Sequence, residues 1–159
     1  MVKLMVLENG SCEVVKNVNT YNELKAKHQD EVNNFPLFFA FNNDQFNEGM
    51  KKFGLNPAQT DKIYKLGGGG YYLKTDAEKL HAMFKNHREE MKQARTDKQF
   101  AFDMFNYELG NHEYTYTGEL DQTLDSLGLT IEETNNNPIL SEGLKKAKKA
   151  QWDWAEKHN

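Results

Sequence analysis

The residue types best suited to chemistry lie in one short segment, where His112 stands between the carboxylates of Glu108 and Glu113. An imidazole and two carboxylates are suitable nitrogen and oxygen ligands for a divalent metal ion, which defines one hypothesis, a metal-dependent hydrolase. No second histidine stands at helical spacing nearby. We therefore favour a structural role in which His112 pairs with Glu108 across one helical turn. On this interpretation the chain is not an enzyme and has no catalytic residue, metal ligand or cofactor.

A run of four glycines is the second candidate site. A phosphate-binding loop needs a Lys and a Ser or Thr directly after its glycines, and here two tyrosines follow instead. The run therefore fits the flexible turn of a hairpin, while tyrosines beside it offer flat faces on which a base can stack. This second reading makes the chain a small-ligand module that sequesters a nucleotide signal. Its ligand-binding residues would be Tyr64, Gly67, Gly68, Gly69, Gly70, Tyr71 and Tyr72.

The third candidate is an acidic segment. Between Lys98 and Lys145 there are nine Asp and Glu residues and no Lys or Arg, so in a chain of net charge −4 the remainder carries about +5. Such a segment is either a solvated helix face or a surface that meets a basic partner, because carboxylates spaced like phosphates can occupy a basic channel. The predicted partner-binding residues are Glu108, Glu113, Glu119, Asp121, Asp125, Glu132 and Glu133.

The first half of the chain carries strand signals. Residues 2–7 and 11–18 are apolar stretches joined by Asn-Gly, which predicts a hairpin. The apolar run 37–41, bounded by proline and asparagine, predicts a buried central strand. Residues 61–66 and 71–74 predict a hairpin around the glycine run.

Helix signals separate and follow these strands. Thr20 and Glu23 form a capping-box pattern that opens a helix to about Asn33, and its thin apolar stripe suggests a surface cover. Asn43 or Asp44 is expected to cap the next helix, which Gly54 ends. Further capping-box patterns start at Thr75, Thr96 and Thr130, with a helix break near residues 94–97 and a last helix after Pro138.

These elements predict an α+β fold, with a small, mostly antiparallel sheet in the N-terminal half packed by helices and a helical C-terminal half. We expect a single domain over residues 1–159, with a tail that frays after about residue 150. No apolar run approaches the roughly 20 residues needed to cross a bilayer. The one cysteine, Cys12, cannot form an internal disulfide, which fits a reducing cytoplasm.

Three segments together resemble a known kind of protein: residues 38–49 (FFAFNNDQFNEG), 67–71 (GGGGY) and 107–114 (YELGNHEY). They are similar to a family of small uncharacterised proteins from bacteriophages and mobile elements of Gram-positive bacteria. The resemblance covers residues 37–145 and implies a phage or mobile-element setting and a cytoplasmic location in the bacterial host cell. It implies no catalytic residues, because the family has no established activity.

Three functions are therefore expected, in order. The first is a non-enzymatic accessory protein that binds and inhibits a host or defence protein, for example a CRISPR or restriction nuclease, through an acidic surface. The second is the nucleotide-sequestering module, and the third is the metal-dependent hydrolase. We expect no membrane partner, and a pI near 5.7 argues against direct nucleic-acid binding. The oligomeric state is open.

Overall fold

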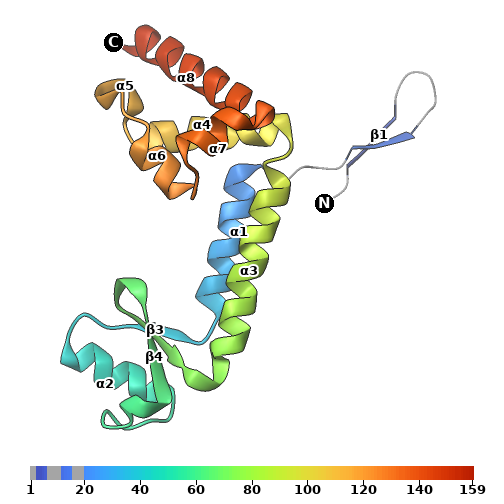
Figure 1. Ribbon diagram of the computed structural model, residues 1–159. Helices are drawn as coiled ribbons and strands as arrows, with labels where there is room; N and C mark the ends of the chain where they lie inside the picture. Colours follow the sequence, from blue (N-terminus) through green and yellow to red (C-terminus); the bar gives the residue numbers. More distant parts are fainter. Residues whose placement is uncertain (1–2, 7–11, 16–19) are drawn as a thin grey trace. The chain divides into compact units, whose positions relative to one another are not determined.

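Short strands alternate with helices before Ala77, and from there to the C-terminus the chain is helical (Figure 1). The computed structural model describes residues 3–6, 12–15 and 20–159. It divides into two compact units: Ala26–Glu89, and the chain on either side of that segment. The chain passes from one unit to the other within α1 (Tyr21–Asn34) and within α3 (Ala77–Ala94). The α+β class predicted from the sequence is confirmed.

The N-terminal hairpin and the helix after it form as predicted. Strand β1 (Lys3–Val6) pairs antiparallel with β2 (Cys12–Val15), whereas the Asn-Gly turn lies outside the described residues. At the start of α1, the Thr20 backbone N–H donates to the Glu23 carboxylate at 3.2 Å, and the Glu23 N–H donates to the Thr20 hydroxyl at 3.4 Å. The reciprocal bonds satisfy two donors that the first helical turn leaves free.

The sheet of the Ala26–Glu89 unit has three antiparallel strands in the order β3–β5–β4. These are β3 (Leu37–Phe39), β4 (Ile63–Leu66) and β5 (Gly70–Leu73), and the glycine run joins β4 to β5 as predicted. The prediction of a buried central strand at 37–41 is wrong, because β3 lies at the edge and β5 lies in the centre. Successive side chains of a strand point to opposite faces, and only the Phe38 face packs on α2.

Helix α2 (Asn43–Lys52) starts one residue earlier than predicted. Its cap is Asn42, which has extended backbone and accepts a hydrogen bond from the Gln45 N–H at 2.8 Å, so neither Asn43 nor Asp44 caps it. The predicted stop at Gly54 is confirmed by its left-handed φ of 72°. Phe38, Met50 and Ile63 form the buried core between α2 and the sheet, with partly buried aromatic rings packed around them.

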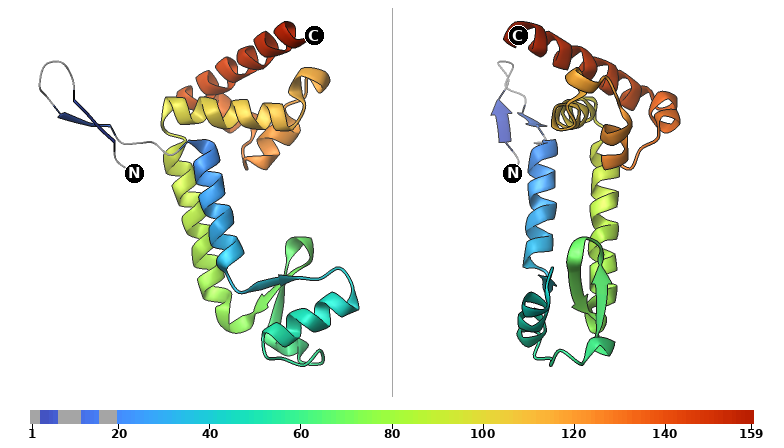
Figure 2. Two further views of the ribbon diagram at one scale, coloured as in Figure 1. Left: turned by 180° about the vertical axis from the view of Figure 1, so that it is seen from behind. Right: turned by 90° about the vertical axis from the view of Figure 1, so that its left-hand side faces the viewer.

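The other unit consists of Met1–Lys25 and Glu90–Asn159 and is called the C-terminal unit. It is built on two long helices, α4 (Lys98–Asn111) and α8 (Pro138–His158), which pack along each other (Figure 2). The close approach uses small residues: a Cβ added at Gly143 would lie 3.1 Å from the Ala101 Cβ. Three short helices join them, α5 (Tyr114–Thr117), α6 (Asp121–Ser126) and α7 (Ile131–Asn136). The helix continues beyond residue 150.

Of the three capping boxes predicted after α2, the one formed by Thr130 and Glu133 at the start of α7 is confirmed. The chain breaks after α3 as expected, but the capping box predicted at Thr96 is wrong. Asp97 caps α4 by accepting from the Phe100 N–H at 2.9 Å, and the Thr96 hydroxyl donates to the Gln93 carbonyl instead. The capping box predicted at Thr75 is wrong as well, because Thr75 lies inside a 3-10 turn over Lys74–Asp76 that precedes α3.

We predict that Gly49→Ala destabilises the protein. A Cβ at this position would lie 2.1 Å from the Phe38 ring, and that ring is held by Phe46, Phe53 and Tyr71 at centroid distances of 5.1–5.9 Å. Overpacking of this kind lowers the free energy of unfolding by about 1–3 kcal/mol, measured by urea denaturation. The control is Gly67→Ala, where the added methyl meets nothing within 4 Å and stability stays unchanged. Equal stability of the two variants would contradict the packing.

Candidate functional sites

The carboxylate of Glu108 is the centre of a buried polar cluster in the C-terminal unit. Its side chain is 3% exposed, and Oε1 accepts hydrogen bonds from the Tyr21 hydroxyl at 2.5 Å and from Lys25 Nζ at 3.0 Å. The other oxygen lies 3.3 Å from His112 Nε2 and 3.4 Å from the Ser126 hydroxyl, which donates to it. These five residues are called the Glu108 cluster. The predicted pairing of His112 with Glu108 across one helical turn is confirmed.

The cluster fixes where its protons lie. Burial acts to raise the pKa of Glu108, but hydrogen bonds from Tyr21 and Lys25, with the charge of Lys25 and the nearby imidazole of His112, outweigh it and hold the pKa below its usual value. Burial and the hydrogen bond to Glu108 raise the pKa of Tyr21. The carboxylate therefore stays ionised and the phenol stays protonated. A carboxylate with a lowered pKa is a weak base, so the cluster is poorly suited to proton transfer near neutral pH.

The sequence placed Glu108 on an acidic surface, and the structure corrects this. Glu108 is buried because α4 turns it toward α1, where a lysine neutralises it. Among the described residues, no group of three or more His, Cys, Asp and Glu side chains is arranged to hold a metal ion. His112 ends α4 and Glu113 precedes α5, so these two neighbours in sequence lie on either side of a helix end. Glu108, His112 and Glu113 therefore do not converge on one point, as the hydrolase hypothesis requires.

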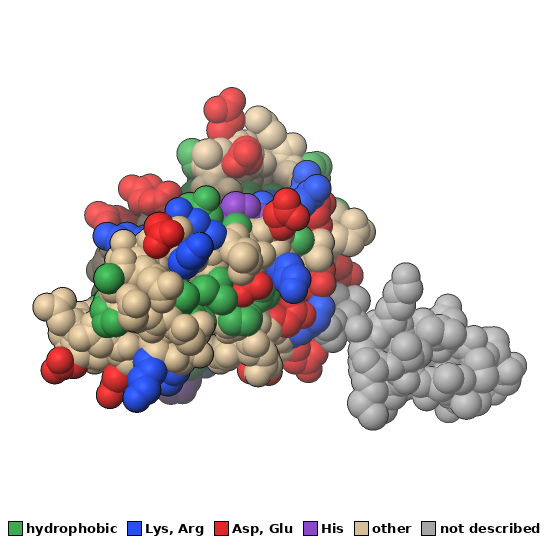
Figure 3. Space-filling view, turned by 90° about the horizontal axis from the view of Figure 1, so that it is seen from below, with side chains coloured by type: hydrophobic (Ala, Val, Ile, Leu, Met, Phe, Trp, Pro, Cys, Tyr) green, Lys and Arg blue, Asp and Glu red, His purple; other side chains and the backbone are tan. Residues whose placement is uncertain are grey.

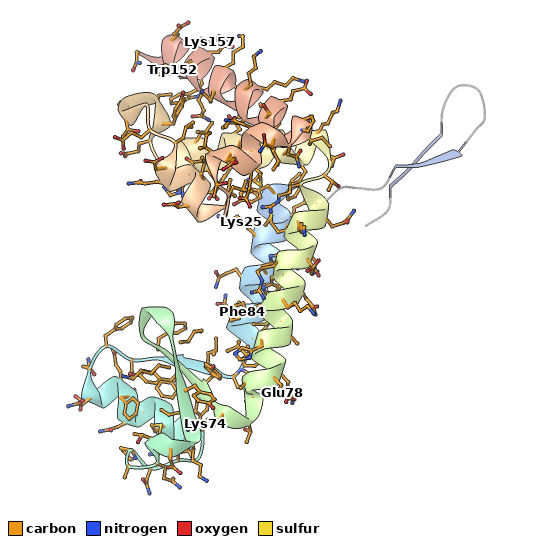
Figure 4. The ribbon with its side chains drawn as sticks, viewed as in Figure 1. Lys25, Lys74, Glu78, Phe84, Trp152 and Lys157 are labelled. Atoms are coloured by element: carbon orange, nitrogen blue, oxygen red, sulfur yellow. The ribbon has the colours of Figure 1, made fainter. Side chains whose placement is uncertain are left out.

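Tyr21 and Lys25 were not among the site residues predicted from the sequence. Both lie on α1, which was expected to be only a surface cover, and they are 87 and 83 residues from Glu108 in sequence. Lys25 projects from α1 (Figure 4) and its Nζ also lies 4.9 Å from the centre of the Tyr107 ring. The available signal was the spacing of a hydroxyl and an ammonium four residues apart on one helical face.

The other six predicted partner-binding acids are exposed and lie along α5, α6 and α7 and their ends. Glu133 has a local role as well, because hydrogen bonds from the Thr130 backbone and hydroxyl lower its pKa. The remaining five are Glu113, Glu119, Asp121, Asp125 and Glu132, and no ion pair joins any of them to a lysine or arginine among the described residues.

A surface hollow of about 420 Å³ lies beside this acidic segment, where α5 approaches α8. Three of its seven lining residues are aromatic, and two of them, Tyr116 and Trp154, have exposed rings; Tyr116 is 81% exposed. Gln151 on α8 fixes one wall, because its amide donates to both oxygens of Asn106 on α4, at 2.8 and 3.0 Å. We call this the α5–α8 hollow; its side-chain lining is Glu113, Tyr114, Thr115, Tyr116, Gln151 and Trp154.

Glu113, at the edge of this hollow, has a strained backbone. Its φ is 54°, and it is the one non-glycine residue with positive φ in the described part of the chain. The conformation arises because α4 ends and α5 begins within three residues, so the chain must reverse at once. The left-handed backbone conformation is about 1–2 kcal/mol less favourable than the right-handed one for a residue with a Cβ, and glycine or asparagine usually occupies such positions. A strained residue at a hollow is a reason to look for function there.

The glycine turn and its tyrosines do not form one stacking surface. Tyr71 packs on Phe38 in the core, with ring centres 5.1 Å apart, whereas Tyr64 and Tyr72 are a cross-strand pair on the opposite face. Gly68 and Gly69 have left-handed φ values of 76° and 83°. Gly69 and Gly70 also give close backbone approach, but to the chain's own rings: an added Cβ would lie 2.8 Å from Phe41 and 3.2 Å from Phe39.

These features define an α+β protein whose polar cluster is internal and whose exposed aromatic and acidic side chains form surface hollows. The chain belongs to the family of unknown function DUF7659, whose model matches residues 20–150. The match includes the segments that carry the resemblance to phage and mobile-element proteins; that setting stays a prediction. Neither the curated proteins nor the solved structures give a match. Within the described residues, no helix is long and apolar enough to span a membrane.

We predict that Glu108→Gln lowers the free energy of unfolding at neutral pH by about 1–3 kcal/mol, because Lys25 and Tyr21 lose a charged acceptor. The pKa of Glu108 is lower in the folded protein than in the unfolded chain, where glutamate has a pKa of about 4.3. The ionised carboxylate therefore stabilises the fold fully at pH values above about 4.3, and this stabilisation is lost as the pH falls through the folded pKa. Urea denaturation between neutral and acid pH therefore gives a shallower loss of stability for the variant than for the wild type.

The matched control is Glu119→Gln, which removes an exposed carboxylate and leaves the acid dependence unchanged. Identical acid profiles for Glu108→Gln and the wild type would show that the cluster does not hold Glu108 ionised.

Proposed function

We propose that this chain is a non-catalytic binding protein that engages a basic surface of a partner protein. The contact would be the α5–α8 hollow together with the exposed acids of α5–α7. The observation that carries the proposal is the strained Glu113, whose carboxylate borders an aromatic hollow. Folding alone favours glycine or asparagine at a left-handed position, so a glutamate there, beside the hollow, supports a role in binding.

The chemistry of this face suits a lysine or arginine side chain. The exposed rings of Tyr116 and Trp154 line the hollow, and one face of Trp154 is stacked on His158 with ring centres 4.4 Å apart. A cation over a free aromatic face gains about 0.5–2 kcal/mol. The Glu113 carboxylate can accept a charge-assisted hydrogen bond from the same cation. Exposed carboxylates on α6 and α7 would steer a basic partner toward the face and make association sensitive to salt.

An absence of catalysis is supported by the same geometry. Glu108 and His112, the titratable groups of the hydrolase hypothesis, lie in an internal cluster with Lys25 and Tyr21. Among the described residues, no three or more His, Cys, Asp and Glu side chains form a group that could hold a metal ion.

In its specific form, the proposal is that the partner is a host or defence protein in the bacterial cytoplasm, such as a CRISPR or restriction nuclease. An acidic face that occupies a basic nucleic-acid channel would compete with the phosphates that normally bind there. The resemblance to phage and mobile-element proteins supports this setting, and the acidic segment supports the type of channel.

We expect reversal of the acidic face to abolish binding of a basic probe. Fluorescence anisotropy with a labelled nona-arginine peptide would measure the wild type and the triple variant Glu119→Lys, Asp121→Lys and Asp125→Lys. The variant should bind at least about tenfold more weakly at low salt, because like charges then oppose the peptide, and high salt should release it from the wild type.

The control variant reverses three exposed acids of the other unit, Glu48→Lys, Glu78→Lys and Glu89→Lys, and so makes the same change in net charge. Equal weakening in both variants would show that only net charge matters and would overturn the proposed face.

Two variants of Glu113 distinguish the effect of its strained backbone on stability from the effect of its charge on binding. Glu113→Asn relieves the left-handed backbone and should raise the free energy of unfolding by about 1 kcal/mol, measured by urea denaturation. Glu113→Gln keeps the strain and should leave stability unchanged. Both remove the carboxylate and should weaken the arginine peptide. Unchanged binding in both variants would mean that Glu113 is no part of the contact.

A further inference from the structure

A second hollow, of about 520 Å³, opens on the Ala26–Glu89 unit between the start of α2 and strand β4. Phe41 and Tyr71 supply aromatic surface to its lining, and Asn42, Asn43, Thr60 and Lys65 supply polar groups. We call it the Phe41 hollow. It lies outside the acidic segment and the α5–α8 hollow, and its lining contains no Asp or Glu.

Phe41 is 77% exposed, yet its backbone is held on both sides. The preceding N–H, of Ala40, donates to the Gly69 carbonyl at 3.0 Å, and the N–H of Phe41 itself donates to the Gln45 side-chain oxygen at 2.8 Å. The ring rests against Gly69, where any larger residue would displace it. An apolar ring held in place at the surface is a prepared platform for another flat ring.

The polar groups around this platform match a nucleotide. The Asn43 amide and the Thr60 hydroxyl offer donors and acceptors for the edge of a base, and Asn42, whose oxygen caps α2, keeps its amide N–H groups as donors. Lys65 offers a cation for a phosphate, and no ion pair involves it among the described residues. The unit as a whole is also less acidic than the chain, with nine Lys and Arg against eight Asp and Glu, a net charge of +1.

Phe41 also lines a neighbouring hollow of about 400 Å³, which includes Gln45 and Lys52. A ring bordered by two hollows offers space for two consecutive bases. Each hollow has one lysine for a backbone phosphate, Lys65 in the first and Lys52 in the second, which is also lined by Glu48. Figure 3 shows one face of the molecule, on which hydrophobic side chains reach the surface among acidic and basic ones.

We propose that the Phe41 hollow binds a nucleobase that carries phosphate, stacked on Phe41 with its phosphate at Lys65. Gly69 of the glycine run then positions the Phe41 ring, so that the FFAF segment and the glycine run form one binding site. The base belongs either to a free nucleotide or to a single-stranded nucleic acid; the two sources share this chemistry and differ in whether the second hollow is used.

The test is binding of two probes, adenosine monophosphate and a labelled oligothymidylate of about twelve residues, by calorimetry and by anisotropy. We expect at least one probe to bind the wild type and to bind Phe41→Leu about tenfold or more weakly, because the stacking face is lost. Lys65→Gln should weaken both probes and reduce their salt dependence. Stronger binding of the oligonucleotide identifies a strand as the source, and comparable binding of the monophosphate identifies a free nucleotide.

Tyr116→Leu is the matched control, because it removes an equally exposed ring from the α5–α8 hollow. It should leave both probes unaffected, and so should the Glu119, Asp121 and Asp125 reversal, which keeps this test separate from the proposed protein contact. Failure of both probes to bind the wild type, or equal binding by the wild type and Phe41→Leu, would overturn the proposal.

Discussion

The C-terminal unit depends on the ion pair between Glu108 and Lys25. A carboxylate that is 3% exposed is stable in the fold only with compensating donors, and three of them come from elements other than α4: Tyr21 and Lys25 on α1, and Ser126 at the end of α6. The pair therefore requires that α1 and α6 both stand against α4. Packing of apolar side chains between α4 and α8 adds buried apolar surface, but the Glu108 cluster specifies which face of α4 meets which neighbouring helix.

The same logic separates structural from functional residues. Glu108, Tyr21, Lys25 and Ser126 are joined by hydrogen bonds inside the cluster, whereas His112 Nε2 is buried 3.3 Å from the Glu108 carboxylate without a hydrogen-bond partner among the described residues. Glu113 and Phe41 depart from what folding alone favours, one by left-handed backbone and the other by an exposed apolar ring. Departures of this kind gather at functional sites, and here each borders a hollow.

Three glycines of the Ala26–Glu89 unit make room for phenylalanine rings. Gly49 lies against Phe38, Gly69 against Phe41, and Gly70 against Phe39, so each aromatic residue of the FFAF segment meets a glycine from α2 or from the glycine run. A glycine run that resembles a flexible turn in the sequence is in this way a packing surface. Two of its members also need the left-handed φ that glycine permits.

Local signals in the sequence determined the helix starts and stops, the two hairpins and the α+β class. The Thr20 and Thr130 capping boxes, the Gly54 stop and the break before α4 rest on contacts within a few residues, and the pairing of His112 with Glu108 rests on one helical turn. Tertiary structure alone decided that β3 is an edge strand, that Glu108 is buried and that Phe41 rests on Gly69. These outcomes depend on partners 28 to 87 residues away, and the periodicity of a segment carries no information about which distant residue will cover it.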